Sequence, residues 1–167
     1  MLFRSMDVNG ELRRDTVTKT VGMNLKYGLH APSMETVMNM IPEAYVKRGQ
    51  ISAKGEVKVN GTLEGNYGNK QLPAISLNIK INDASARYEG LPYGIDNFTA
   101  DFESYIDLMR RNPSFLNLKI LHFEGVHTKI LADAKVEDLL IDPFITLHTE
   151  STVDLDALAK TFPLQES

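Results

Sequence analysis

The sequence predicts a mainly β protein. We expect an antiparallel meander, in which each strand pairs with the next, forming a strongly curled or groove-like sheet with two short helices. Apolar and polar residues alternate with a period of two over several stretches after about Pro73. Gly, Pro, Asn and Asp interrupt these stretches at short intervals, as turns require. Two further segments open with residues that favour helix N-termini and stop at a proline.

Composition limits the chain to one domain of ordinary globular character. It has 167 residues, of which 43% are hydrophobic and 24% are charged. A net charge of -4, without a basic cluster, argues against nucleic-acid binding. There is no cysteine, so disulfides and thiolate metal sites are excluded. Because residues 2–8 already have a strand pattern, we expect residues 1–167 to be a single β-rich segment of a larger protein.

The clearest predicted strand covers residues 75–81. Its odd-numbered residues are Ile or Leu and the residues between them are polar, which places the two kinds on opposite faces of a strand. Asn82 and Asp83 then favour a turn. The sequence therefore predicts a hairpin whose second strand covers residues 84–89.

Further strands follow with short connections, which favours a meander. The same alternation recurs within residues 98–108, 116–120, 126–136 and 144–153. It places one apolar row on each strand. The residues that we expect on the apolar face are Ile75, Leu77, Ile79, Ile81, Phe98, Phe102, Ile106, Leu116, Leu118, Ile120, Ile145 and Leu147.

Two short helices are predicted at residues 33–41 and 154–162. Each begins with a good N-cap residue and is followed by proline. The two segments align without a gap, and a strand pattern precedes each of them. We therefore expect an internal repeat of a strand plus a short helix at residues 24–42 and 145–163.

Signatures of catalysis are missing from the sequence. There is no nucleophile elbow, phosphate-binding loop or zinc-protease motif, so we expect no enzyme activity and no cofactor. The Gly-rich stretch 61–70 has no helix after it, so a bend or loop between strands is favoured over a phosphate site. We also expect no metal site at the four histidines, which are His30, His122, His127 and His148.

The predicted strands carry more apolar surface than two short helices can cover. The sheet must close on itself, pack on another sheet, or keep a groove that another molecule fills. A strip of Ile, Leu, Val and Phe suits acyl chains, because apolar burial is non-directional and contributes roughly 25 cal/mol per Å². The same alternation also fits a closed sandwich with a dry core, so both interpretations remain open.

Four stretches resemble the C-terminal portion of AsmA-like proteins of diderm bacteria. They are residues 61–65, 72–81, 86–92 and the strand-to-helix stretch 151–163. The resemblance implies an inner-membrane-anchored periplasmic protein whose repeated β modules form a long curled sheet with an apolar groove, related to bridge-like lipid-transfer proteins. It also implies a role in outer-membrane lipid homeostasis and outer-membrane protein assembly.

Two function hypotheses follow. The first is a non-catalytic segment of an AsmA-like envelope protein, which contributes an apolar β groove for lipid binding or transfer. Its expected partners are lipid or acyl chains and neighbouring repeats of the parent protein, with membrane contact through an anchor outside this chain. The alternative is a protein-interaction scaffold, which pairs through its sheet edges or through adjoining repeats during outer-membrane protein assembly.

Overall fold

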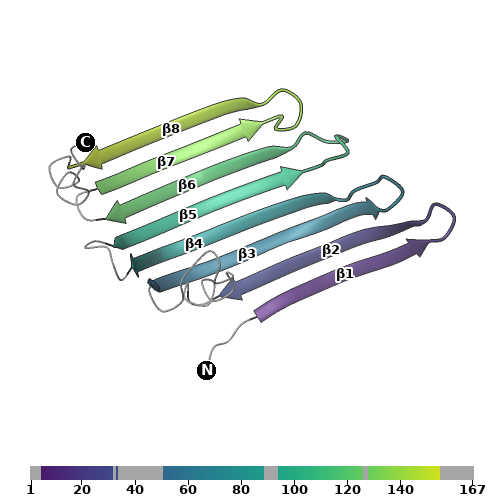
Figure 1. Cartoon of the computed structure of the whole chain (residues 1–167), viewed down its shortest axis with the longest axis horizontal. Helices are drawn as coiled ribbons and strands as arrows, with labels where there is room; N and C mark the ends of the chain where they lie inside the picture. The colour runs from purple at the N-terminus through teal and green to yellow at the C-terminus, as the bar shows by residue number, and fades with distance from the viewer. Residues whose placement is uncertain (1–4, 32, 34–50, 89–93, 126–127, 155–167) are drawn as a thin grey trace, which may run out of the picture.

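The fold is one sheet of eight antiparallel strands arranged in chain order (Figure 1). The computed structural model describes residues 5–31, 33, 51–88, 94–125 and 128–154. The sheet is not closed, and β1 and β8 are its two edges. The mainly β class and the meander are confirmed. The strands are β1 (Ser5–Asp15), β2 (Thr20–Ala31), β3 (Ile51–Tyr67), β4 (Ala74–Tyr88), β5 (Ile95–Ile106), β6 (Phe115–Gly125), β7 (Thr128–Glu137) and β8 (Phe144–Val153).

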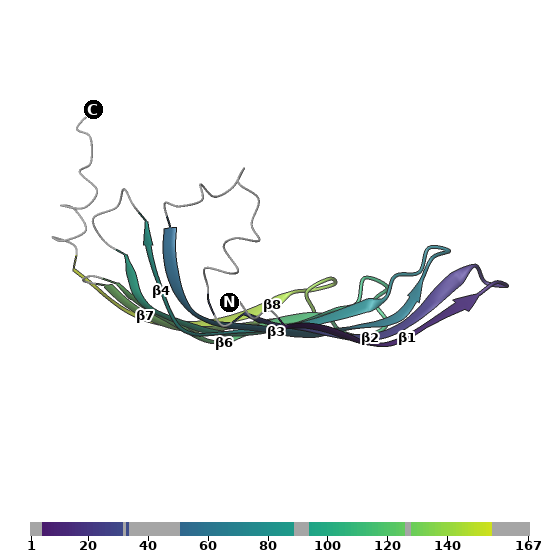
Figure 2. The same cartoon turned by 90° about the horizontal axis from the view of Figure 1, so that it is seen from below.

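The sheet is a single shallow layer. Figure 2 shows it edge-on, with most strand ends bending gently toward one side and the start of β3 and end of β4 rising more steeply, so a strong curl of the whole sheet is not supported. No helix occurs among the described residues. The helices expected at 33–41 and 154–162 lie outside the described residues except for their first positions, and so does the helical half of the expected repeat. The strand halves of that repeat fall in β2 and β8.

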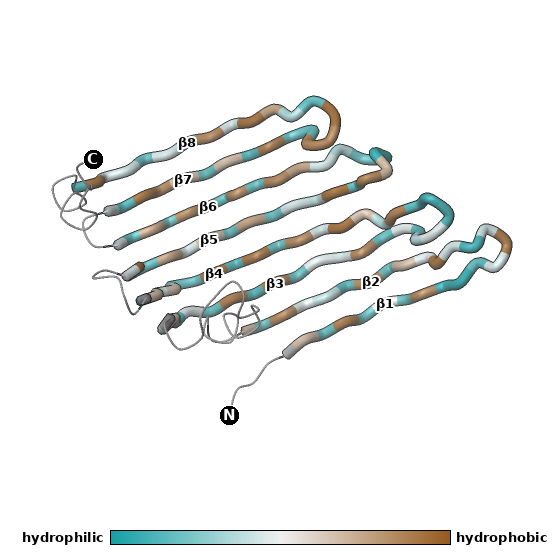
Figure 3. The backbone as a smooth tube through the Cα atoms, in the orientation of Figure 1, coloured by the Kyte–Doolittle hydropathy of each residue, from teal (hydrophilic) through white to brown (hydrophobic). Residues whose placement is uncertain are grey.

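Every strand separates apolar from polar side chains, because successive residues of a strand point to opposite faces. Figure 3 shows this as an alternation of hydrophobic and hydrophilic residues along the strands. Side chains directly opposite one another on neighbouring strands share a face. The register pairs Leu63 with Ile75 and Ile75 with Ile106, so the apolar sides of β3, β4 and β5 coincide.

The backbones of β3 and β4 lie unusually close together where the two strands bend. The register of β3 shifts at Gly55, which adopts φ +119°. A Cβ on Gly55 would lie 2.5 Å from the Cα of Ala84, so a larger residue does not fit there. Ala53, Val57 and Ala84 are among the few buried apolar residues in the described part of the chain. In Figure 2 the start of β3 and the end of β4 rise together at this bend.

Replacing Gly55 with alanine should destabilise the sheet by about 1–3 kcal/mol, because it adds both backbone strain and a clash. The midpoint of urea unfolding measures this. The matched control is Gly22→Ala, whose Cβ would meet the Asn66 side-chain oxygen at 3.3 Å and the Arg13 carbonyl oxygen at 3.6 Å, without a clash against the backbone. An equal and small effect of both variants would contradict this role of Gly55.

The turn expected at Asn82 and Asp83 is wrong. β4 continues through these residues to Tyr88, and its register with β5 shifts between Ile81 and Ala84. Asp83 adopts φ +46°, a conformation that aspartate tolerates better than most residues. The two polar residues therefore form a bulge within one long strand, because β3 and β5 supply pairing partners on both sides of it.

The Gly-rich stretch 61–70 is mostly strand, so the loop expected there is also wrong. β3 runs to Tyr67, and the tight turn that follows is closed by hydrogen bonds between Gly68 and Gln71. A Cβ on Gly61 would lie 2.3 Å from the Tyr27 ring. That ring extends across β3, and its hydroxyl donates to the Ser76 carbonyl at 2.8 Å. Gly61 thus makes room for an aromatic ring from the neighbouring strand.

The connection from β5 to β6 is built around Asp107, whose side chain is fully buried. Its carboxylate accepts the backbone N–H groups of Met109, Arg111 and Asn112 at 3.0–3.2 Å. The Arg111 guanidinium also bonds both carboxylate oxygens, and hydrogen bonding from Arg111 holds the pKa of Asp107 below its ordinary value of 3.8. A second Arg111 bond reaches the Leu72 carbonyl at 3.2 Å, so this cluster ties together two neighbouring connections.

Replacing Asp107 with asparagine should destabilise the protein by about 2–3 kcal/mol at neutral pH, because the amide group cannot accept all these bonds. Since the folded-state pKa of Asp107 is lowered, its stabilising effect is complete above 3.8 and is lost as the pH falls through the folded-state pKa. Urea unfolding from neutral pH to about pH 3 should therefore show a smaller acid-induced loss for the variant than for the wild type. Asp142→Asn, at an exposed turn, is the control and should behave as the wild type.

Candidate functional site

The candidate functional site is the apolar face of the sheet. One row of directly opposed apolar residues crosses all eight strands, which we call the central row. A chain of opposed neighbours of this kind lies in a line across a sheet, on one face. From β1 to β8 the central row is Met6, Leu29, Val59, Ile79, Phe102, Leu118, Ala134 and Leu147.

The rows on both sides of the central row are also largely apolar. One contains Val8, Tyr27, Leu77, Leu116, Val136 and Ile145, together with Gly61 and Ser104. The other runs from Ala31 through Val57, Ile81, Ala100, Leu121 and Ala132 to Thr149. No charged residue belongs to any of these three rows. The apolar face is therefore continuous along the sheet as well as across it.

The residues that the sequence placed on the apolar face lie there with one exception. Ile120 lies opposite Asp101, whose carboxylate pairs with Lys80 on the polar face, and its side chain is 51% exposed. The cause is a bulge at Lys119 and Ile120, which inserts an extra residue into β6. After the bulge Leu121 takes the position on the apolar face that strict alternation assigned to Ile120. The sequence carried a signal for this change, since Leu121 and Phe123 are both apolar.

The list of apolar-face residues expected from the sequence also lacks every residue before 73. β1, β2 and β3 supply a large part of the apolar face, including Leu12, Leu25, Leu29, Val59 and Leu63. Residues 57, 59 and 63 alternate with polar residues as clearly as residues 75–81 do. Gly61 interrupts this series, and a glycine in that place favours a loop when the sequence is considered alone. In the structure the space beside Gly61 is filled by the ring of Tyr27, which comes from another strand.

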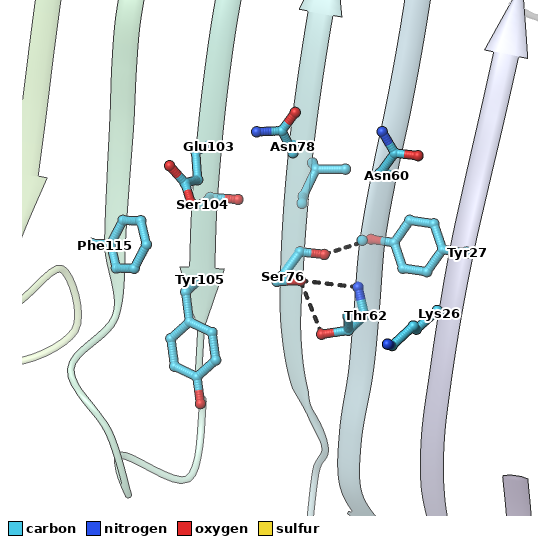
Figure 4. Close-up of a pocket in the computed structure, with 12 residues that line it drawn as sticks. Lys26, Tyr27, Asn60, Thr62, Ser76, Asn78, Glu103, Ser104, Tyr105 and Phe115 are labelled. Carbon is cyan, nitrogen blue, oxygen red and sulfur yellow. Dashed lines mark hydrogen bonds between the residues drawn. The ribbon is translucent and has the colours of Figure 1, made fainter. Parts of the chain in front are cut away.

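The apolar face lies on the concave side of the sheet. Figure 4 looks at the polar face. When β3 is followed along its chain direction, β4 lies to its left in Figure 1 and to its right in Figure 4. The two figures therefore view opposite faces, and Figure 1 looks at the apolar one. Figure 2 is turned so that this face points upward, and the strand ends bend upward in it. The result is a shallow trough whose axis runs across the strands.

Large side chains of the apolar face are exposed on the edge strands β1 and β8, whereas the central row is half-buried on β2 to β7. The exposed fraction is 62% for Leu12 and 65% for Ile145 and Leu147. A protein domain ordinarily packs such a face against a second layer. Among the described residues all eight strands belong to the one sheet, so none of them supplies that layer. The described strands therefore leave one side of this face without a packing partner.

The opposite face carries ion pairs between charged residues on neighbouring strands. Lys80 lies 3.0 Å from Asp101, and Lys119 lies 2.5 Å from Glu103, which raises the pKa of Lys119 by hydrogen bonding. Near the start of β3, Glu56 bonds Lys58 and His30, and these bonds lower its pKa. Such pairs stabilise neighbouring strands modestly and mark this face as the solvated one.

The polar face also carries an open depression of about 510 Å³ over the middle strands (Figure 4). Asn60, Thr62, Ser76 and Tyr105 are among the residues that line it. The Ser76 hydroxyl already bonds the Thr62 hydroxyl at 2.9 Å and accepts the Thr62 backbone N–H at 3.0 Å. The hydroxyls of Thr62 and Ser76 are thus already bonded to each other across β3 and β4.

Metal ligation and helical membrane insertion find no support in the described ranges. They contain no group of three His, Asp or Glu side chains that could hold a metal ion. They also contain no helix of the length and hydropathy needed to cross a bilayer. His127 lies outside the described residues.

Comparison of the chain with protein-family models, with curated proteins and with solved structures found no match. The geometry of the sheet is thus the main basis for a functional proposal.

Proposed function

We propose that this chain is a non-catalytic lipid-binding sheet whose apolar face accommodates acyl chains. The observation that carries the proposal is the central row, which crosses all eight strands without a polar interruption and is left uncovered by the described residues. The concave bend supports it, because a trough surrounds a ligand on more than one side. The absence of charge from the three apolar rows supports it too, because a hydrocarbon chain cannot compensate a buried charge.

The dimensions of the apolar face fit acyl chains. Eight strands spaced by about 4.8 Å give a trough about 34 Å long. This compares with a thickness of about 30 Å for the hydrocarbon core of a bilayer, which two acyl chains span end to end. A chain lying along the trough axis would contact one side chain of the central row on each strand it crosses. Each methylene that it buries would contribute about 0.8 kcal/mol.

We further propose that the sheet belongs to an AsmA-like envelope protein that is anchored in the inner membrane and extends into the periplasm. The resemblance of residues 61–65, 72–81, 86–92 and 151–163 to that family supports this assignment. In such a protein the trough would carry lipid for outer-membrane biogenesis. An open meander suits this role, because its edge strands can pair with adjoining β modules.

A pair of variants on opposite faces tests lipid binding. Phe102→Glu places a carboxylate in the central row, whereas Ile120→Glu places one on the polar face of the next strand. We expect Phe102→Glu to weaken binding of a fluorescent fatty acid to the delipidated chain at least about tenfold, because a buried aromatic side chain is worth about 1.5–3 kcal/mol. Ile120→Glu should bind as the wild type does. The readout is fluorescence titration, with circular dichroism to confirm that both variants retain the sheet.

No fluorescence gain with the wild-type chain would contradict the proposed function. Equal loss of binding in both variants would contradict the assignment of the ligand to the apolar face. If Phe102→Glu loses the sheet itself, Leu118→Asn, which removes apolar surface from the same row without adding a charge, provides the comparison.

The second candidate function is a protein-interaction scaffold. It is favoured by the two edges of the sheet, since β1 and β8 each pair with only one strand of the described ranges and all ten residues of β8 are exposed. An exposed edge strand readily adds a strand from another chain. Crosslinking in an envelope extract that recovers proteins on β1 or β8, together with purified chain that retains no lipid, would favour this function over the first.

A further inference from the structure

The edge strand β1 carries charges that the described part of the chain does not neutralise. On the polar face of β1, Asp7, Glu11 and Arg13 form no ion pair with any described residue. They lie opposite Gly28, Asn24 and Gly22 on β2, none of which carries a charge. In the interior strands, by contrast, Asp101, Glu103 and Glu124 each pair with a lysine. These three charged side chains of β1 can therefore form ion pairs with a strand that adds to the free edge.

We propose that β1 pairs antiparallel with β1 of a second copy of this chain, about a two-fold axis that passes through Gly10 perpendicular to the sheet. In this register Asp7 lies opposite Arg13 of the second copy, and the symmetry repeats that pair. On the other face Val8 lies opposite Leu12, also twice. Both kinds of directly opposed pair stabilise antiparallel strands. The remaining pairs place Asn9 opposite Glu11, Met6 opposite Arg14 and Ser5 opposite Asp15, each twice, and Gly10 opposite itself, without a like-charge contact.

The charge pattern selects this register over its neighbours. A shift that centres the axis on Asn9 would place Asp7 opposite Glu11, twice. A shift in the other direction, which centres the axis on Glu11, would oppose Glu11 to itself and Asp7 to Asp15. Like charges directly opposite one another destabilise a strand pair. Because a two-fold axis perpendicular to the sheet preserves its faces, only registers centred on one residue are available, and Gly10 is the favourable centre among these three.

The opposite edge is less suited to pairing with itself. Its polar face offers His148 and Glu150, but His148 already lies 3.3 Å from Asp133 on β7. Asp133 of β7 thus already engages the polar face of that edge, whereas Asp7 and Arg13 have no ion-pair partner among the described residues. We therefore assign the contact between copies to β1.

This pairing would produce a single sixteen-stranded sheet with both apolar faces on the same side. The two troughs would join end to end and double in length, without a change in either protomer. The contact itself requires no lipid, since it is made by backbone hydrogen bonds and the side chains of β1. Dimer formation and lipid binding can therefore succeed or fail separately.

Sedimentation of the full 167-residue chain with charge-exchange variants tests the pairing. We expect the wild type to form dimers that weaken as salt is added, because the ion pairs are exposed. Arg13→Asp should raise the dimer dissociation constant about tenfold or more, since it turns two attractive pairs into repulsive ones. Asp7→Arg should do the same. The double variant Asp7→Arg/Arg13→Asp restores both pairs in reverse and should recover the dimer. A purely structural effect on the protomer would not show this recovery.

The cysteine-free sequence allows a direct check of the register. A mixture of Val8→Cys and Leu12→Cys chains should form disulfide-linked dimers that contain one chain of each kind. Either variant alone should crosslink far less, because position 8 does not oppose itself. Glu150→Lys on β8 is the control and should leave dimerisation unchanged. A wild-type monomer at every concentration, failure of the double variant to recover the dimer, or loss of the dimer only in Glu150→Lys would each overturn the proposal.

Discussion

The structure depends on one constraint: a single antiparallel layer must form an apolar face that it cannot itself bury. In the described residues the eight strands pair only with sequence neighbours, and the central row from Met6 to Leu147 lies on the uncovered side. Ordinary domains resolve this problem with a second layer or by closing the sheet. Here the described strands form one open layer, so an apolar face with no second layer of described residues becomes the main chemical property of the sheet. The proposed role in binding lipid follows from that property, because it needs no reactive group.

With so small a core, the sheet relies on its backbone ladders and on a few specific side-chain contacts. Gly55 lets β3 approach Ala84 on β4 where both strands bend. Tyr27 crosses β3 over Gly61 to bond the carbonyl of Ser76 on β4, joining three strands. Asp107 and Arg111 fix the connection between β5 and β6 and attach it to Leu72. These contacts fix the positions of the strands while leaving the apolar face free, which is what a binding surface of this kind requires.

Sequence reasoning identified the class of fold because period-two alternation depends directly on strand geometry. It placed Ile75, Ile79 and Phe102 on one face for the same reason. It was wrong about Ile120 because a bulge shifts the alternation by one residue, and the position of a bulge depends on the neighbouring strands. It was wrong about Asn82 and Asp83 for a related reason, since the residues favoured in a turn are also favoured in a bulge. The Gly-rich part of β3 was missed because Gly61 makes room for the ring of Tyr27, which is distant in sequence.

The face that contacts hydrocarbon can be mapped directly with a photoreactive fatty acid. The purified chain would be delipidated, loaded with a fatty acid that carries a diazirine near its methyl end, irradiated and digested for mass spectrometry. If hydrocarbon binds at the apolar face, we expect labels on residues of the three apolar rows, such as Ile79, Phe102 and Leu118, and no label on Ile120 or on the charged pairs of the opposite face. Labels distributed equally over the two faces, or no specific labelling at all, would contradict the central claim that the apolar face is a lipid-binding surface.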